Sequence, residues 1–153
     1  MDAFQMVDTK GKGWVTGPEL LSSLADYGVY PHKEDVYLFT RHYDRDSDGR
    51  LLFSDFCDAF CPLEPALALE LNRRDAYHVH KGFSRSMYFR KETRDHYMRV
   101  IRLHMSIEES AELLRKKLQK RPGFSLHSAF SHLDVHQQGY LTEQDFMRLM
   151  HEH

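Results

Sequence analysis

The chain has 153 residues, of which 41% are hydrophobic and 29% carry a formal charge. That balance is typical of a folded protein and excludes an intrinsically disordered one, and the length suffices for one domain or two small lobes. The formal net charge of −2, with the 11 histidines counted as neutral, excludes the strong basic bias of a nucleic-acid-binding domain.

The cysteines and the apolar runs bear on the compartment. The two cysteines, Cys57 and Cys61, lie four residues apart, which fits neither a zinc nor a redox motif, so we expect reduced thiols and a cytoplasmic protein. No apolar run approaches the ~20 residues of a membrane span, and the first residues do not form a secretory signal. We therefore expect neither a membrane nor a nucleic acid among the partners.

Three segments of the chain share one layout, in which an apolar helical stretch is followed by a loop and by a second apolar helical stretch. The twelve-residue loops span 8–19, 44–55 and 134–145. In each loop the sixth residue is glycine, the eighth is apolar and the twelfth is acidic. The flanking apolar residues recur at spacings of three and four, which places them on one helical face. The pattern predicts three helix–loop–helix units in an all-α protein.

The first loop, residues 8–19, keeps the frame but lacks the ligands of a cation site. Lys10 and Lys12 stand at its third and fifth positions, where oxygen ligands belong, and two ammonium groups repel a cation. We expect one of the two lysines to take the place of the cation by pairing with Glu19 at the twelfth position. The loop is therefore predicted to bind no metal.

The second loop, residues 44–55, has the pattern of a Ca²⁺ site. Such a loop supplies side-chain oxygens from positions 1, 3, 5 and 12 and a backbone carbonyl from position 7, and glycine at position 6 permits the sharp turn. An acidic surface turn is the alternative interpretation. The predicted ligands are the carboxylates of Asp44, Asp46, Asp48 and Asp55 and the carbonyl of Arg50.

Two departures from that pattern predict weak binding. Position 12 is Asp55 rather than Glu, and the shorter side chain makes bidentate ligation harder, which favours six-coordinate Mg²⁺. Leu52 at position 9 has no side-chain oxygen, and Arg45 and Arg50 lower the local negative potential. We therefore expect a Ca²⁺ dissociation constant in the micromolar range or above, with Mg²⁺ as a competing ion.

Between the second and third units the layout is interrupted. Pro62 and Pro65 precede a short helix predicted over 66–72, an irregular stretch follows around 77–88, and a long helix is predicted over 91–120. The long helix has an apolar stripe on one face and charged residues on the opposite face. We interpret the charged face as a solvated one that would also suit an acidic tubulin surface. The apolar stripe along this helix consists of Val100, Ile107, Ala111, Leu114 and Leu118.

The third loop, residues 134–145, has an intermediate set of donors. Asp134, Gln138 and Asp145 offer oxygens, but His136 at position 3 offers nitrogen, which is a poor match for Ca²⁺. A zinc site at His132 and His136 is the alternative, although no cysteine or second histidine pair completes it. We predict a degenerate hand without a bound ion.

With these loops and flanks, the chain resembles the EF-hand, or calmodulin-like, superfamily over residues 1–60 and 124–150. The resemblance implies an all-α fold in which hands pair back to back through a short two-stranded β contact, with Val15 near Leu51. The expected organisation is a paired EF-hand lobe at 1–61, an irregular linker with a short helix at 62–90, a long linker helix at 91–121 and a third, degenerate EF-hand at 122–153.

The function that this resemblance implies is non-catalytic calcium binding by a structural or interaction protein. No nucleophile elbow, phosphate loop or catalytic metal motif is found in the sequence. The linker-helix arrangement is similar to larger multi-EF-hand proteins of motile cilia, which implies an axonemal, microtubule-associated role with tubulin as a partner. The alternative is a calcium-sensor regulatory subunit of a larger enzyme or motor complex, in which ion binding exposes Phe39, Phe56 and Phe60 to an amphipathic helix.

An unpaired third hand needs cover for its apolar helix face, which includes Phe130, Phe146 and Met150. We expect the long helix to pack on this face as a bound target helix would. A degenerate partner hand within residues 77–97 and self-association with a second chain are the alternatives, since an unpaired loop also presents open strand edges.

Overall fold

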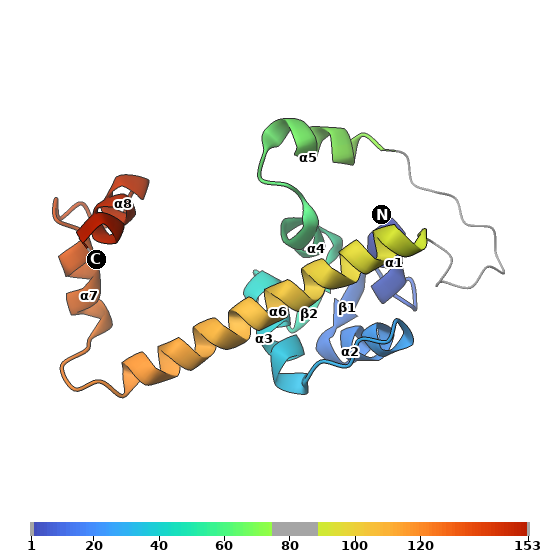
Figure 1. Ribbon diagram of the computed structural model, residues 1–153, viewed down its shortest axis with the longest axis horizontal. Coiled ribbons are helices and arrows are strands. Elements are labelled where there is room, and N and C mark those ends of the chain that lie inside the picture. The colour runs from blue at the N-terminus through green and yellow to red at the C-terminus, as the bar shows by residue number, and fades with distance from the viewer. Residues whose placement is uncertain (1, 75–88, 153) are drawn as a thin grey trace. The chain divides into compact units, whose positions relative to one another are not determined.

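The elements of the computed structural model, which describes residues 2–74 and 89–152, follow the predicted order (Figure 1). The first hand comprises α1 (Asp2–Val7), β1 (Trp14–Thr16) and α2 (Gly17–Asp26). The second comprises α3 (Lys33–Tyr43), β2 (Arg50–Leu52) and α4 (Phe53–Phe60). The remaining elements are α5 (Pro65–Asn72), the long α6 (Lys91–Gln119), and α7 (Leu126–Leu133) and α8 (Glu143–Glu152) of the third hand. The predicted all-α fold is confirmed.

The helices predicted between the second and third hands are present. The short helix α5 begins at Pro65, and α6 ends at Gln119, just before the Arg121-Pro122-Gly123 sequence that was expected to stop it. The irregular stretch predicted around 77–88 lies outside the described residues. None of the helices in the described parts of the chain is long and apolar enough to cross a membrane.

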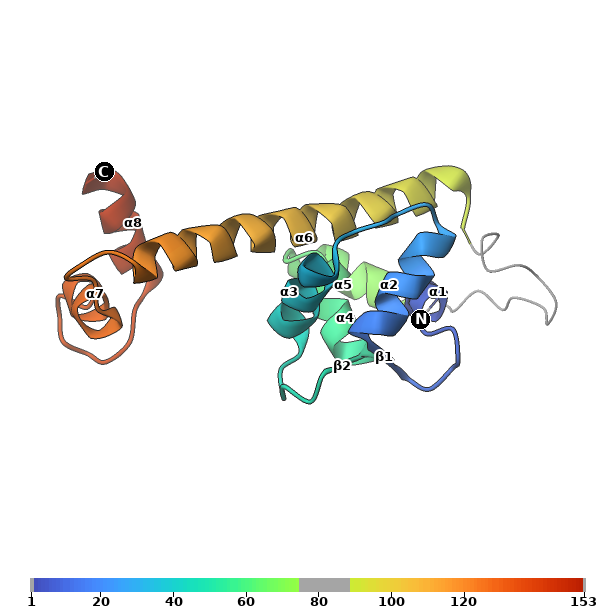
Figure 2. The same ribbon diagram turned by 90° about the horizontal axis from the view of Figure 1, so that it is seen from below.

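The chain forms two compact units, Met1–Ala111 and Glu112–His153. The first unit contains the first two hands, α5 and most of α6. The second contains the end of α6 and the third hand, whose helices α7 and α8 are joined by the third loop (Figure 2). The candidate ion site predicted at 44–55 therefore belongs wholly to the first unit.

The loops of the first two hands meet in a two-stranded antiparallel sheet. Positions 7, 8 and 9 of one loop lie opposite positions 9, 8 and 7 of the other, so the pairing is symmetric about position 8. Successive side chains of a strand point to opposite faces, and the two central residues are both directed into the core. The predicted contact is confirmed by the register, which pairs Trp14 with Leu52, Val15 with Leu51 and Thr16 with Arg50.

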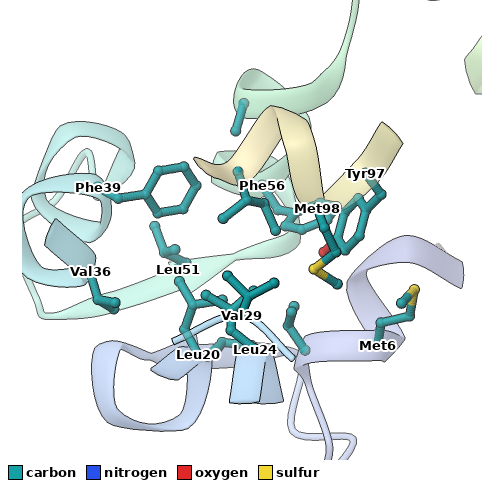
Figure 3. Close-up of a cluster of buried hydrophobic side chains, with 14 of the residues drawn as sticks. Met6, Leu20, Leu24, Val29, Val36, Phe39, Leu51, Phe56, Tyr97 and Met98 are labelled. Atoms are coloured by element: carbon teal, nitrogen blue, oxygen red, sulfur yellow. The ribbon is translucent and has the colours of Figure 1, made fainter. Parts of the chain in front are cut away.

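The hydrophobic core of the first unit is shared between the EF-hand pair and α6. Each of the four helices of the pair contributes buried side chains, whereas α5 contributes none. The first part of α6 lies along α1 and α4 (Figures 1 and 2), and Tyr97 and Met98 lie close to Phe56 in the close-up (Figure 3). The buried residues of α6 are Tyr97, Met98, Ile101 and Met105.

The apolar stripe predicted for the long helix is not its buried face. Ile107, Leu114 and Leu118 are exposed, and Val100 and Ala111 are half-buried. Two apolar stripes on α6 have helical spacing. The stripe that contains Tyr97 is buried, because the Tyr97 ring stacks on Phe60 of the second hand. Sequence spacing could not choose between them, because the choice depends on a surface formed by distant residues.

The packing of the long helix on the third hand stays a prediction. The side chains that α6 buries all lie in the first unit, between residues 97 and 105. Phe130, Phe146 and Met150 of the third hand are exposed by 38%, 51% and 77%. The buried face of α6 therefore covers the first two hands.

Candidate metal centre

All three loops are closed by the same set of hydrogen bonds from backbone N–H groups to a side-chain carboxylate. In each loop the carboxylate at position 1 accepts hydrogen bonds from the backbone N–H groups at positions 5 and 6. The glycine at position 6 has a φ of 83°, 82° or 79°, a left-handed conformation that disfavours any side chain. The bonds run from Lys12 and Gly13 to Asp8 (3.0 and 2.7 Å), from Asp48 and Gly49 to Asp44 (3.2 and 2.8 Å), and from Gln138 and Gly139 to Asp134 (2.9 and 2.7 Å).

The acidic residue at position 12 ties the end of each loop to the helix that follows. Its carboxylate accepts a hydrogen bond from the backbone N–H at position 9, which satisfies a donor at the start of that helix. The donors and acceptors are Thr16 and Glu19 (3.2 Å), Leu52 and Asp55 (2.9 Å), and Thr142 and Asp145 (2.8 Å). The loop geometry is thus complete in each hand, whatever its ligand chemistry.

Only the second loop gathers carboxylates around a common point. Asp44, Asp46 and Asp48 each place an oxygen within 4.8 Å of the others, and no second group of this kind is found in residues 2–74 and 89–152. The hydrogen bond with the Asp44 carboxyl raises the pKa of Asp46, because two adjacent carboxylates share a proton more readily than both ionise. This set of hard oxygen donors fits Ca²⁺ or Mg²⁺, either of which would relieve the repulsion.

The other two predicted ligands are placed differently. Asp55 is 4% exposed and lies outside the cluster of three carboxylates, with one oxygen bonded to the Leu52 N–H. The side chain of Arg50 extends to Asp48, with its Nε 3.6 Å from a carboxylate oxygen, and its guanidinium lies over the Trp14 ring. The positive charge of Arg50 is therefore at the site, as expected, whereas Arg45 pairs with Asp58 of α4. Ligation by Asp55 and by the Arg50 carbonyl stays a prediction.

Two lysine ammonium groups supply positive charge inside the first loop. The Nζ of Lys12 lies 2.8 and 2.7 Å from the two carboxylate oxygens of Glu19, and the Nζ of Lys10 lies 2.9 Å from one of them. These two ammonium groups lower the pKa of Glu19 to about 2. The predicted pairing is confirmed, and both lysines take part in it. Lys12 also lies over the Trp14 ring, 3.3 Å from its centroid, in a cation–π contact.

The third loop has neither a lysine pair nor a carboxylate cluster in the part of the chain that the structure describes. The Thr142 hydroxyl donates to the Asp145 carboxylate at 2.6 Å, and this bond lowers the pKa of Asp145. Asp145 is therefore held by Thr142, and Asp134 by backbone amides. The absence of a bound ion from this loop stays a prediction.

Sequence reasoning missed the polar contacts that join the second hand to α6. The Tyr43 hydroxyl lies 2.6 Å from Nδ1 of His104, and Nδ1 of His42 lies 3.0 Å from a carboxylate oxygen of Glu108. His42 and Tyr43 end α3 and are followed at once by Asp44, the first residue of the loop. The spacing of His104 and Glu108 on one face of α6 was a signal, but nothing local links His104 to Tyr43, which lies 61 positions away.

The comparison with known proteins finds a match to the first two hands. The family model of the EF-hand domain pair matches residues 1–61, the segment that contains both hands of the paired lobe. No curated protein matches the chain. The third hand lies beyond the matched residues, although its loop has the same hydrogen bonds as the other two. Residues 1–61 of this chain thus match an EF-hand domain pair, and within this segment the second loop carries the carboxylates suited to calcium.

Proposed function

We propose that the protein is a non-catalytic calcium-binding module that serves as a structural or interaction protein, with one ion held at residues 44–55. We further propose that the ion stabilises the module and does not open it. The observation that carries this proposal is the position of α6, which fills the apolar groove of the EF-hand pair where a sensor would receive its partner helix.

The contacts of α6 with the pair are extensive. The Tyr97 ring stacks on Phe60 with 4.9 Å between centroids, and its hydroxyl donates to the backbone carbonyl of Ala3 at 3.2 Å. Ile101 is 1% exposed. The space left between Ile101 and the core of the pair is about 10 Å³, at the lower limit for a single water molecule. A groove filled to this degree offers a partner helix no entry unless α6 leaves.

A partner helix would also compete with a segment of the same chain. A tethered segment acts at an effective concentration on the order of millimolar, so the partner must bind the groove far more tightly than α6 does. An ion that binds only the folded hand stabilises that hand by mass action, about 1.4 kcal/mol at a concentration ten times its dissociation constant. Weak binding by the second loop therefore suffices for a stabilising role.

Calorimetric titration of the full chain tests the ion site. We expect one Ca²⁺ per chain, with a dissociation constant in the micromolar range or above, and competition by Mg²⁺. Asp44→Asn should abolish the binding heat, whereas Asp134→Asn, the same change at position 1 of the third loop, should leave it intact. Two bound ions, or equal losses in both variants, would contradict the one-site proposal.

An apolar dye distinguishes a filled groove from an opening one. We expect Ca²⁺ to leave dye fluorescence unchanged in the native chain, because Ile101 and its neighbours occupy the groove. Ile101→Asp should raise dye binding without Ca²⁺, and Ile107→Asp, at an exposed position of the same helix, should not. A Ca²⁺-dependent rise in the native chain would support the sensor subunit instead.

The cellular setting belongs to the same proposal. We place the protein on microtubules of the axoneme, on the strength of its likeness to multi-EF-hand proteins of motile cilia and of the exposed basic side chains on α6, such as Arg99, Arg102 and Lys117. Acidic tubulin surfaces attract such a face. Co-sedimentation with microtubules should be lost in an Arg99→Glu, Arg102→Glu variant, and a protein absent from isolated axonemes would rule this setting out.

A further inference from the structure

The third hand leaves exposed the positions that the second hand buries. With Asp134 aligned on Asp44, Leu126 corresponds to Val36, Phe146 to Phe56 and Met150 to Phe60. Val36 and Phe56 are 2% and 8% exposed, and Phe60 is half-buried, whereas the exposed fractions of Leu126, Phe146 and Met150 are 80%, 51% and 77%. These three apolar side chains, together with the neighbouring Phe130 and Met147, form a face that we call the third-hand face.

The loop of the third hand also lacks the strand partner that the first two loops provide for each other. Tyr140, Leu141 and Thr142 occupy positions 7, 8 and 9, but the described residues of the second unit contain no strand. No hydrogen bond to the backbone of Leu141 is found within the described chain, whereas Thr142 N–H is already bonded to Asp145. A short strand edge centred on Leu141 is therefore open beside the third-hand face.

The register of β1 with β2 indicates what such an edge accepts. Because position 8 pairs with position 8, and position 7 with position 9, the partner required by an EF-hand loop is another loop of the same form in antiparallel orientation. The third loop meets that requirement itself. Two copies related by a two-fold axis would place Leu141 opposite Leu141 and Tyr140 opposite Thr142 twice, an aromatic and β-branched pairing that favours strands.

We propose that the third hand pairs with the third hand of a second copy of this chain, which makes the protein a two-fold symmetric dimer. The two third-hand faces would cover each other, as the helices of the first two hands do within one chain. Two-fold interfaces of this kind use the same patch twice and are the commonest among homo-oligomers. This proposal does not depend on ion binding by the second loop.

Sedimentation of the full chain over a range of concentrations tests the proposal. We expect a monomer–dimer equilibrium, with a dimer prevailing at roughly 100 μM. Phe146→Glu combined with Met150→Glu should weaken dimerisation by at least about tenfold, since it places charges on both faces of the interface. The matched control is Leu63→Glu combined with Leu67→Glu, which alters exposed leucines of the first unit and should leave the dimer intact.

Two results would overturn the proposal. One is a monomer at every concentration, which would leave the third-hand face to a different protein. The other is a dimer that the Leu63 and Leu67 changes abolish and the Phe146 and Met150 changes spare. Far-UV circular dichroism on each variant distinguishes loss of the interface from loss of the third-hand helices.

A cross-link tests the register even where those substitutions unfold the hand. In a chain with Cys57→Ser and Cys61→Ser, a Leu141→Cys change should form a disulfide-linked dimer on mild oxidation, because paired strand positions lie within disulfide range. Val135→Cys, at position 2 of the same loop and also exposed, is the control and should not cross-link. Equal cross-linking of the two variants, or none in either, contradicts the two-fold pairing.

Discussion

The second and third hands of this protein have the same loop but different surroundings. Asp44 and Asp134 accept hydrogen bonds from the same two positions of their loops, and Gly49 and Gly139 adopt the same left-handed conformation. The second hand nevertheless packs against α1, α2 and α6, whereas the third leaves Phe146 exposed. The shape of an EF-hand loop is therefore a local property, and the burial of its flanking helices depends on a partner.

The same comparison separates the loop frame from the ligand set. The first loop holds two lysine ammonium groups, the second gathers three carboxylates, and the third has a histidine at position 3. All three are folded to the same turn. The backbone conformation of a loop therefore does not predict ion binding. Ion binding depends on the charged side chains at the ligand positions.

The largest expected difference between the second and third hands lies in their corresponding phenylalanines. Phe56→Ala should lower the free energy of unfolding by about 3–5 kcal/mol, because it leaves a cavity among Phe4, Phe60 and Tyr97. Phe146→Ala should cost less than about 1 kcal/mol in dilute solution, since that side chain is half solvated. Urea unfolding followed by circular dichroism measures both. Similar costs would mean that the third hand is covered within one chain.

Lengthening the acid at position 12 should sharpen the contrast in ion binding. We expect Asp55→Glu to tighten Ca²⁺ binding by about tenfold and to weaken the competition by Mg²⁺, because Glu reaches the ion with both oxygens. Asp145→Glu, the same change in the third loop, should produce no Ca²⁺ site, since His136 and Gln138 supply no carboxylate. Calorimetry measures both variants, and a gain of binding in the Asp145 variant would show that the third loop is competent.

Acid should weaken the first loop through Glu19. The ammonium groups lower its folded pKa from 4.5 to about 2, so the stabilisation from the lysine pairs is complete above pH 4.5 and is lost as the pH falls towards 2. A Lys10→Met, Lys12→Met variant should show a smaller loss of stability over that range. Trp14 fluorescence during acid titration reports the transition, because Lys12 lies over its ring. An unchanged acid response in the variant would assign the loss to other carboxylates.

The smallest expected effect concerns the contact between α3 and α6. Burial, reinforced by His42, lowers the pKa of His104, and burial raises the pKa of Tyr43, so the fold favours the neutral form of both groups where the Tyr43 hydroxyl lies against Nδ1 of His104. The Ala59 carbonyl and Glu108 also face His104 and oppose this shift in part. Stability should therefore decline modestly as the pH falls below 6.5.

A pair of histidine variants isolates that contribution. His104→Gln should flatten the pH dependence of the urea midpoint between about pH 5 and 7, the range in which an ordinary histidine titrates. His96→Gln, on the exposed face of the same helix, should leave the dependence as it is. If both variants behave like the native chain, His104 is not the group that titrates.

Much of the fold and of the candidate site could be predicted from the sequence. The three loops, the lysine pairing with Glu19 and the bounds of α6 to within one residue all follow from patterns within a few turns of chain, whereas the contact of Val15 with Leu51 was implied by the resemblance to paired EF-hands. These features can be predicted because glycine conformation, carboxylate hydrogen bonds and helix stops depend on residues that are close in sequence. The Asp44, Asp46 and Asp48 cluster was predicted for the same reason.

The buried face of α6 could not be predicted in this way. The stripes that contain Ile101 and Ile107 both consist of apolar residues at helical spacing. The sequence alone therefore did not indicate which of the two stripes would be buried. In the structure the stripe with Tyr97 is buried. Tyr97 stacks on Phe60, and His104 lies beside Tyr43. This face of α6 joins the core of the first two hands.

The sequence by itself determined where the chain turns and which turn carries the charge for a cation, because each twelve-residue loop is closed by bonds among its own atoms. Only the tertiary structure decided which apolar faces are covered, that α6 fills the groove of the pair, and that the third-hand face remains exposed. Burial is a relation between residues far apart in the chain, and no local pattern specifies the surface on which a helix will pack.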